Sequence, residues 1–145
     1  MVVIDRSALL GHDAAEIYAL VDDVESYPRF LPWCDGAQVR LQGGLRSTAT
    51  IHINFHGIRQ QFTTENVSEP SGAISMKLVS GPFRRLQGQW RFTPLGDQAC
   101  KVEFHLEYEI ASRVLERAIG PVFQHIANTL MDAFSARADE LYARR

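Results

Sequence analysis

The sequence predicts an α+β fold in which a sheet of consecutive antiparallel strands packs against one long C-terminal helix. Two patterns lead to this prediction. Between residues 36 and 110, apolar and polar residues alternate in short segments, as is typical of strands with one buried face. From residue 121 onward, apolar residues recur at three- and four-residue steps, as is typical of an amphipathic helix. Because the predicted strands follow one another with short connections, an antiparallel meander is favoured.

The N-terminal region is predicted to contain one strand, at residues 2–9, and one short helix. Asp13 is a suitable N-cap, and Glu16 three residues later completes a capping-box pattern. Apolar residues between positions 17 and 21 form one face of this helix, which we expect to end near residue 22.

The next segment, Tyr27–Cys34 (YPRFLPWC), combines two prolines with large apolar and aromatic side chains. Proline lacks a backbone N–H and restricts the residue before it, so an ordinary helix or a central strand is excluded here. Irregular chain normally runs over the surface and is polar. The apolar side chains of this segment therefore either pack onto the protein's own core or form the rim of a cavity that an apolar ligand enters.

The central region is predicted to contain six further strands. Turns rich in glycine and proline separate them, for example at Gly43-Gly44 and Gly96-Asp97. The last strand shows the clearest alternation, with apolar residues at every second position from Val102 to Ile110. The predicted strands are residues 37–42, 48–56, 58–67, 73–80, 83–94 and 101–110.

The C-terminal region is predicted to form two helices. Ser112 is placed to cap a short helix through Ala118, and Gly120-Pro121 is expected to break it, with Pro121 as the first residue of the second helix. This second helix extends to Tyr142 and carries one continuous apolar stripe. The stripe consists of Phe123, Ile126, Ala127, Leu130, Phe134, Ala138 and Leu141.

The predicted sheet is wider than the helix that has to cover it. Seven strands at a spacing of ~4.8 Å span roughly 30 Å, whereas one helix is only about 10 Å across. A twisted sheet can curl around the helix, which leaves either an apolar pocket of the kind that binds small ligands or a fully packed core. The side chains expected on the inner face are Ile51, Ile53, Phe55, Met76, Leu78, Trp90, Phe92, Phe104 and Leu106.

Composition places the chain among ordinary globular proteins, and we expect residues 1–145 to form one domain. Hydrophobic residues make up 46% and charged residues 22% of the sequence. No apolar run approaches the ~20 residues of a membrane-spanning helix, and Asp5 and Arg6 interrupt any signal-peptide core. We therefore expect a cytoplasmic protein, with a peripheral position at the inner membrane as the alternative. The net charge of −2 argues against a general nucleic-acid coat, and no DNA partner is expected.

Cysteine and histidine residues show no metal-binding pattern. Cys34 and Cys100 lack the spacing of a zinc motif, and we expect both to be buried, reduced thiols. His52 and His56 fall ~13 Å apart by strand rise, which is too far for one ion. His105 lies between two glutamates on the predicted solvent face, where a cross-strand ion pair is the expected role.

Signatures of an enzyme are also absent. The sequence has no nucleophile elbow, phosphate-binding loop or dinucleotide fingerprint, and no pair of carboxylates on the predicted inner face. Tyr108 and Asn66 are the only polar groups that could serve an aromatase or cyclase activity in a cavity. We therefore expect a protein without catalytic residues, bound metal or cofactor.

Arginine supplies most of the positive charge. Arg84, Arg85 and Arg91 cluster around one predicted hairpin, and Arg144-Arg145 end the sequence. These residues could contact lipid head groups or the phosphates of ribosomal RNA. A solvated surface without a partner is the alternative.

Three strings in the sequence point to a family: YPRFLPWC, GPFRRLQGQWRF (residues 81–92) and FQHIANTLMDAFSARADELY (residues 123–142). With them, the chain resembles the family of coenzyme Q-binding proteins and ribosome association toxins (the RatA family). This family belongs to the START-like, polyketide cyclase and lipid transport superfamily. The resemblance covers essentially the whole chain. It implies a helix-grip fold, in which a seven-stranded antiparallel sheet curls around a long C-terminal helix, with two short helices at one end.

The resemblance also implies a function. It implies non-enzymatic binding of an isoprenoid quinone in a hydrophobic tunnel, in support of respiratory electron transport. The alternative is a toxin that binds the large ribosomal subunit and blocks its joining to the small one, and a cyclase-like enzyme is a third reading. The expected ligand-binding residues are Tyr27, Phe30, Leu31 and Trp33 at the mouth, Ile51, Ile53, Phe83, Trp90, Phe92 and Phe104 on the strands, and Phe123, Ala127, Leu130 and Phe134 on the helix.

Overall fold

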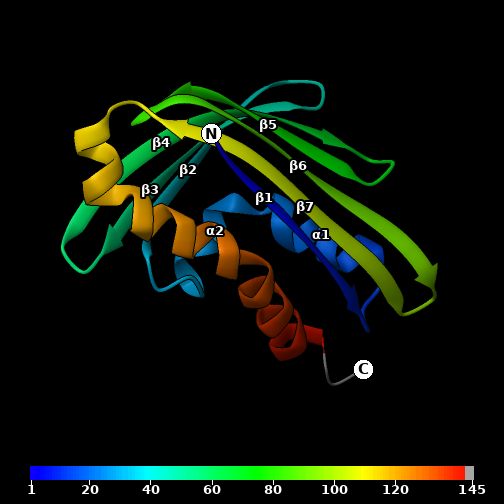
Figure 1. Cartoon of the computed structure of the whole chain (residues 1–145). Helices are drawn as coiled ribbons and strands as arrows, with labels where there is room; N and C mark the ends of the chain where they lie inside the picture. Colours follow the sequence, from blue (N-terminus) through cyan, green and yellow to red (C-terminus); the bar gives the residue numbers. More distant parts are fainter. Residues whose placement is uncertain (143–145) are drawn as a thin grey trace.

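Seven antiparallel strands form one sheet in the computed structural model, which describes residues 1–142 (Figure 1). The strand order is β1-β7-β6-β5-β4-β3-β2, so β2 to β7 form a meander and the N-terminal strand lies beside the last one. The strands are β1 (Val2–Leu10), β2 (Cys34–Gly43), β3 (Arg46–Phe55), β4 (Ile58–Glu69), β5 (Ala73–Ser80), β6 (Phe83–Gly96) and β7 (Ala99–Ile110). The helical segments are α1 (Ala14–Asp22), the 3₁₀ helix η1 (Val24–Arg29) and α2 (Arg113–Tyr142).

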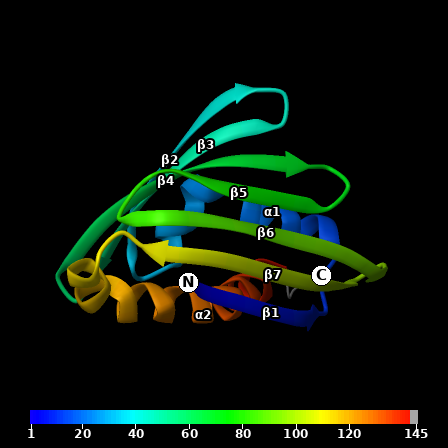
Figure 2. The same cartoon turned by 45° about the horizontal axis from the view of Figure 1, so that its top comes forward.

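The sheet curls around α2, as the sequence predicts. Figure 1 shows α2 running along the concave side of the sheet, and Figure 2 shows β6, β7 and β1 side by side, with α2 next to β7 and β1. Helix α1 contacts α2, β6 and β7, while η1 contacts β2. The two short helices thus close the space that α2 alone leaves uncovered.

Helix α1 begins and ends where the sequence predicts. The Asp13 carboxylate accepts a hydrogen bond from the backbone N–H of Ala15 at 3.2 Å, which satisfies one of the free donors of the first turn. Ile17, Leu20 and Val21 are buried against the core. The Tyr27–Cys34 segment then turns inward: its first residues belong to the 3₁₀ helix η1, which contains Pro28, and its last residue begins β2.

Helix α2 differs from the sequence prediction. The expected break at Gly120-Pro121 is wrong, because one continuous helix runs from Arg113 to Tyr142 with Pro121 inside it. Figure 1 shows this helix changing direction after its first turns. A proline inside a helix bends it rather than ending it where packing holds both sides in place. Ile119 and Phe123, on either side of Pro121, are both buried and supply that packing.

The core joins the sheet to α2 through aromatic rings. The Trp90 ring on β6 stacks on Phe104 of β7 at a centroid distance of 4.3 Å, and meets Phe134 of α2 edge-on at 5.5 Å. Tyr27 of η1 also contacts Phe134, at 5.3 Å. These rings hold η1, α2 and the concave face of the sheet together around the site described next.

Candidate functional site

An apolar cavity of about 80 Å³ lies between the concave face of the sheet and the helices. Its wall combines residues from α1, η1, the strands β3 to β7 and α2. Side chains of strand residues reach it because alternate positions of each strand face the same side of the sheet. The residues expected from sequence that lie in this wall are Tyr27, Trp33, Ile51, Trp90, Phe104, Phe123, Ala127 and Leu130.

Two other expected residues, Ile53 and Phe83, line a smaller neighbouring cavity of about 10 Å³. Phe62 and Phe123 belong to the walls of both cavities, and their rings lie 5.9 Å apart in edge-to-face contact. This pair of rings therefore forms the partition between the two spaces.

The remaining expected residues pack behind the wall rather than lining it. Leu31 is 1% exposed within the core. The Phe92 ring lies against Tyr18, at 5.4 Å, and Phe134 contacts Trp90. Phe30 is half-buried, with the Arg137 guanidinium 5.3 Å from its ring centre. These residues fix the position of the wall, and their contact with a ligand stays a prediction.

Several residues of the wall were not among the expected ligand-binding residues. Met76 and Leu106 were expected on the inner face, and the structure places both in the wall. The alternation of β4 could have identified Phe62, whereas Val24 and Ile126 reach the cavity only through the curl of the sheet around the helices. The further residues of the wall are Val21, Asp22, Ala49, Thr64, Asn66, Ile74 and Leu86.

Two polar side chains of β4 interrupt the apolar wall. Thr64 is 3% and Asn66 is 8% exposed, and the Thr64 hydroxyl donates a hydrogen bond to Asn66 Oδ1 at 2.7 Å. Asp22, which is exposed, supplies the only charge of the wall among the described residues. Its carboxylate accepts a hydrogen bond from the Ser68 hydroxyl at 2.6 Å. Tyr108, the other polar candidate from the sequence, is buried but lies outside this wall.

Tyr27 anchors the segment that closes the cavity. Its hydroxyl donates a hydrogen bond to the Val21 carbonyl at 2.5 Å. Burial raises the pKa of Tyr27, and the negative charge of Asp22 raises it further. The phenol therefore stays protonated and keeps its role as a donor. This bond ties η1 to the end of α1 at one side of the cavity.

Both cysteines are free and buried, as the sequence predicts. Burial raises the pKa of the Cys34 thiol, and the thiol donates a hydrogen bond to the Gly36 carbonyl at 3.4 Å. Burial likewise raises the pKa of Cys100. Because the thiolate is the reactive form, both side chains behave as small apolar groups of the core.

The histidines lie apart from the cavity wall. His105 forms the expected cross-strand ion pair: its Nδ1 lies 2.8 Å from Asp5 of β1, and its Nε2 lies 2.8 Å from Glu107. His52 bonds to Gln38 at 2.8 Å, while His56 lies in the turn after β3 with a φ of 51°. Residues 1–142 contain no group of three or more His, Cys, Asp or Glu side chains suited to a metal ion.

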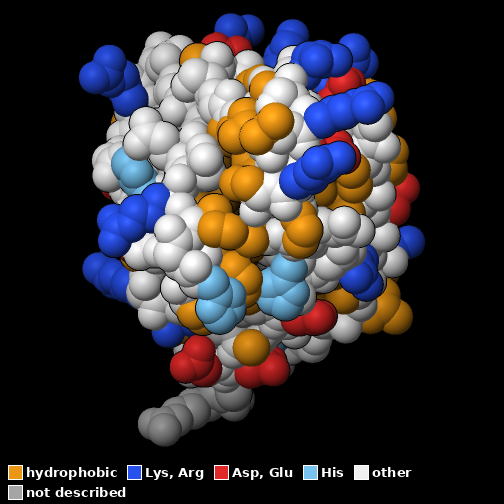
Figure 3. Space-filling view, turned by 60° about the vertical axis from the view of Figure 1, so that its left-hand side comes forward, with side chains coloured by type: hydrophobic (Ala, Val, Ile, Leu, Met, Phe, Trp, Pro, Cys, Tyr) orange, Lys and Arg blue, Asp and Glu red, His pale blue; other side chains and the backbone are white. Residues whose placement is uncertain are grey.

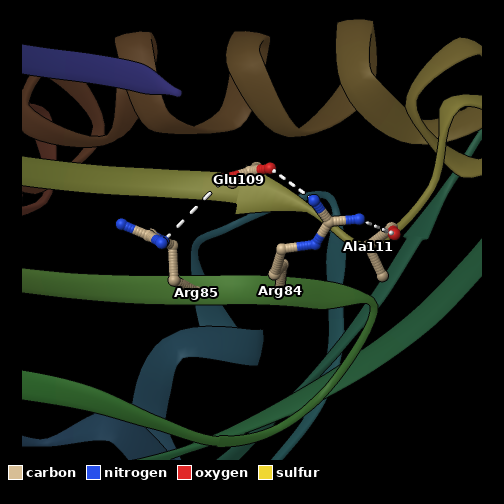
Figure 4. A network of polar contacts seen from close by, with 4 residues as sticks. All are labelled: Arg84, Arg85, Glu109 and Ala111. Carbon is tan, nitrogen blue, oxygen red and sulfur yellow. Dashed lines mark hydrogen bonds and ion pairs between the residues drawn. The ribbon is translucent and has the colours of Figure 1, made fainter.

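The arginine cluster is partly neutralised. Figure 4 shows Arg84 and Arg85 on β6 converging on Glu109 of β7, at 3.1 and 3.8 Å. Arg84 also donates to the Ala111 carbonyl at 3.2 Å. Arg91 is exposed further along β6, whereas Arg144 and Arg145 lie outside the described residues.

A mixed apolar and basic surface lies on the side where α2 begins. Figure 3 views this side of the molecule and shows a continuous run of hydrophobic side chains. Lys and Arg side chains lie on both sides of the run and two histidines lie beside it, while Asp and Glu side chains lie among the cations on one side and around its lower end. Such a surface offers both apolar and cationic contacts to a partner.

Comparison with known proteins identifies a matching family and similar proteins. The family described as polyketide cyclase / dehydrase and lipid transport matches residues 10–135. The ribosome association toxin RatA of Escherichia coli K12 is 42% identical over 142 residues, which cover 98% of this chain and 90% of that protein. The mitochondrial coenzyme Q-binding protein COQ10 homolog B of Xenopus laevis is 24% identical over 144 residues, which cover 97% of this chain and 59% of that protein.

Solved structures share the fold. An 18 kDa protein from Caulobacter crescentus is 32% identical, with a TM-score of 0.76 over 99% of both chains. A START superfamily protein from Mycobacterium smegmatis is 21% identical, with a TM-score of 0.77 over 96% of this chain and 98% of that one. The Zhui aromatase/cyclase of Streptomyces is 14% identical, with a TM-score of 0.73 over 95% of this chain and 93% of that one. At these identities, the second and third structures show a common fold alone.

Proposed function

The chain belongs to the polyketide cyclase / dehydrase and lipid transport family, and from this premise we propose that it binds a hydrophobic small molecule in the cavity without transforming it. An isoprenoid quinone or a closely similar lipid is the proposed ligand, in support of respiratory electron transport. The observation that carries the proposal is the cavity itself, whose wall is mostly apolar. The exceptions are the side chains of Thr64, Asn66 and Asp22, together with the hydroxyl of Tyr27 and the indole N–H groups of Trp33 and Trp90. A wall of this composition is typical of small-ligand sites.

The size of the cavity sets a condition on the ligand. An apolar cavity of about 150 Å³ accommodates one benzene molecule, so a space of about 80 Å³ accommodates only a few carbon atoms in the present conformation. A quinone ring with part of its tail therefore requires the sheet and the helices to move apart, because the neighbouring space behind Phe62 and Phe123 adds only about 10 Å³. Burial of each CH₂ group then contributes about 0.8 kcal/mol, before the cost of ordering the ligand.

Tryptophan fluorescence provides the test, because both tryptophans of the chain, Trp33 and Trp90, lie in the cavity wall. Titration with a short-tail ubiquinone is expected to quench this fluorescence saturably, at one ligand per chain. The variant Ala127→Phe places a ring in the cavity and is expected to abolish saturable quenching while keeping its thermal unfolding cooperative. The matched control Ala136→Phe changes an exposed position of the same helix and is expected to quench like the wild type. Linear quenching without saturation in the wild type would contradict the proposal.

Association with ribosomes is a second candidate function. It is favoured by the 42% identity to a protein named as a ribosome association toxin, over 98% of this chain. We place this activity on the outer surface, where exposed arginines such as Arg84 and Arg85 are available to phosphate groups. The proposed partner is the large ribosomal subunit, with a toxin-like block of subunit joining as the consequence.

Sucrose-gradient profiles of overexpressing cells test this second function. Free subunits are expected to increase at the expense of assembled ribosomes, with the protein in the large-subunit fractions. The double variant Arg84→Glu with Arg85→Glu is expected to reduce the effect, and Ala127→Phe is expected to preserve it because the cavity is a separate site. An unchanged profile with no protein in the large-subunit fractions would remove this candidate.

A catalytic function has weaker support than ligand binding or ribosome association. The likeness to an aromatase/cyclase at 14% identity concerns the fold. Asp22 is the only carboxylate in the wall among the described residues, so an acid–base pair of carboxylates is not assembled there. Binding without chemistry is therefore the function that we propose.

The proposed location is the cytoplasm, with contact to the inner membrane during ligand exchange. In residues 1–142, no helix has the length and hydrophobicity needed to cross a membrane. The mixed apolar and basic surface of Figure 3 supports contact with a membrane from one side.

A further inference from the structure

The two buried polar residues of β4 have an unusual position. Leaving aside tyrosine, tryptophan and cysteine, Thr64 and Asn66 are the only buried polar residues in the part of the chain that the structure describes. Both lie in the wall of the apolar cavity. They are two positions apart on one strand, so their side chains share the inner face of the sheet.

Their neighbours across the sheet do not explain this placement. Thr64 lies in register between two apolar residues, Ala49 of β3 and Leu78 of β5. Asn66 lies in register between Ser47 and Met76. Burial of a polar group costs free energy unless the group is hydrogen-bonded. The bond between Thr64 and Asn66 satisfies the hydroxyl and the amide oxygen but does not use the amide nitrogen.

The hydrogen bond within the pair orients the Asn66 amide. The Thr64 hydroxyl donates to Asn66 Oδ1 at 2.7 Å, which assigns the acceptor side of the amide to Thr64. The amide nitrogen carries two N–H donors. Within residues 1–142, no side chain or backbone group accepts a hydrogen bond from this nitrogen. Since the residue is 8% exposed and lies in the cavity wall, these donors are available to a molecule inside the cavity.

We infer that Asn66, held in position by Thr64, is the polar anchor of the cavity, and that its amide N–H donates to a carbonyl oxygen of a neutral, otherwise apolar ligand. This inference rests on the proposed function and specifies the ligand class. The apolar wall accepts a ring or hydrocarbon body, and the amide selects an oxygen acceptor on it. A quinone ring has this chemistry.

The charge of the wall argues against a carboxylate as the acceptor. Asp22 is the only ionisable acid in the wall, and no Lys, Arg or His side chain among the described residues lines the cavity to balance a second negative charge. A fatty-acid carboxylate would thus be desolvated without a cation partner. A neutral carbonyl carries no such penalty.

Binding of two ligands with the same ring skeleton tests the inference. Isothermal titration calorimetry compares 2-methyl-1,4-naphthoquinone with 2-methylnaphthalene, which lacks the carbonyls. The wild type is expected to prefer the quinone about tenfold, equivalent to about 1.4 kcal/mol. Asn66→Leu is expected to bring this preference close to one while retaining binding of the hydrocarbon. Thr64→Val is expected to reduce the preference partly, because the amide loses its orienting partner.

A pair of threonines outside the cavity wall supplies the control. Thr50 and Thr63 share a hydrogen bond of 2.8 Å between β3 and β4 but lie outside the cavity wall. Thr50→Val is therefore expected to leave the tenfold preference unchanged. Asn66→Leu leaves the buried Thr64 hydroxyl without its acceptor, so the unfolding temperature is expected to fall, and a single cooperative transition shows that the variant is folded.

The outcomes separate the inference from the proposed function. Equal affinity of the wild type for both ligands, or an unchanged preference in a folded Asn66→Leu variant, would overturn the inference and leave hydrophobic binding intact. Failure of the wild type to bind either ligand would overturn the proposed function and, with it, the inference.

Discussion

At the scale of single residues, a few polar contacts position the apolar elements. Tyr27 shows this most clearly, because its ring belongs to the cavity wall while its hydroxyl bonds to the Val21 carbonyl. The pair of Thr64 and Asn66 has the same character on β4. The sequence analysis singled out Tyr27 and Asn66 but not Thr64, because Thr64 stands in a polar stretch and the sequence contains no information on which side chains face one another.

Removal of the Tyr27 hydroxyl tests its anchoring role. Tyr27→Phe leaves the ring contacts in place and leaves the buried Val21 carbonyl without its donor. We expect the free energy of unfolding to fall by about 1–3 kcal/mol. Urea unfolding followed by tryptophan fluorescence measures this, and an unchanged midpoint would show that the hydrogen bond contributes nothing.

His105 makes the stability of the sheet edge depend on pH. Hydrogen bonds to Glu107 and Asp5 raise the pKa of His105 above its ordinary value. A raised pKa in the folded state means that the stabilisation is present below the unfolded value and is lost as pH rises through the folded value. The pKa of Glu107 is lowered by His105, so its contribution is lost in acid instead.

The expected result is a stability difference between wild type and His105→Gln that is larger at pH 6 than at pH 8. Urea unfolding at the two pH values measures the difference. Asp5 on β1 and Glu107 on β7 are the carboxylates bonded to the imidazole, and Gln89 of β6 lies in register beside it. A difference that stays constant between the two pH values would contradict this assignment.

At the scale of elements, local pattern and tertiary packing differ in what they determine. Alternation along β3 to β7 predicted the strands and the inner face, because the two-residue period is a local property. The break at Gly120-Pro121 was predicted from a local rule and is wrong, because Ile119 and Phe123 pack on the same core on both sides of the proline. The residue pattern missed the 3₁₀ helix η1 for a related reason, since Pro28 was taken to exclude an ordinary helix, whereas buried Val24 and Tyr27 hold a short 3₁₀ turn around it.

The proline of α2 leads to a stability prediction. Pro121 lacks the N–H that would bond to the carbonyl four residues earlier, while the helix continues through it. Pro121→Ala restores this donor at an exposed position, so we expect the free energy of unfolding to rise by about 1–3 kcal/mol. Chemical denaturation measures the change. A destabilised variant would show that the bend itself is required for packing of the first turns.

At the scale of the whole molecule, the width of the sheet relative to α2 explains why space remains inside. The sequence predicted this mismatch from strand number and helix diameter, and left open whether a pocket or a packed core fills it. The structure contains an apolar cavity of about 80 Å³, together with a second space of about 10 Å³ behind Phe62 and Phe123. Wall residues such as Val24 and Ile126 could not be assigned from the sequence, because their positions depend on how far the sheet curls.

The separation of inner cavity and outer surface allows two activities in one domain. The cavity faces α2 and the short helices, whereas Arg84 and Arg85 lie exposed on β6. Variants of one site are therefore expected to leave the other active. Ligand binding in the cavity can therefore be measured separately from any association with ribosomes.

Lipid analysis of the protein purified from its own cells tests the central claim most directly. Mass spectrometry of the extracted lipids is expected to find one neutral, carbonyl-bearing apolar compound in near-stoichiometric amount, and to find it depleted in Ala127→Phe. Recovery of only trace, mixed membrane lipids from both proteins would contradict the claim that this cavity holds a ligand.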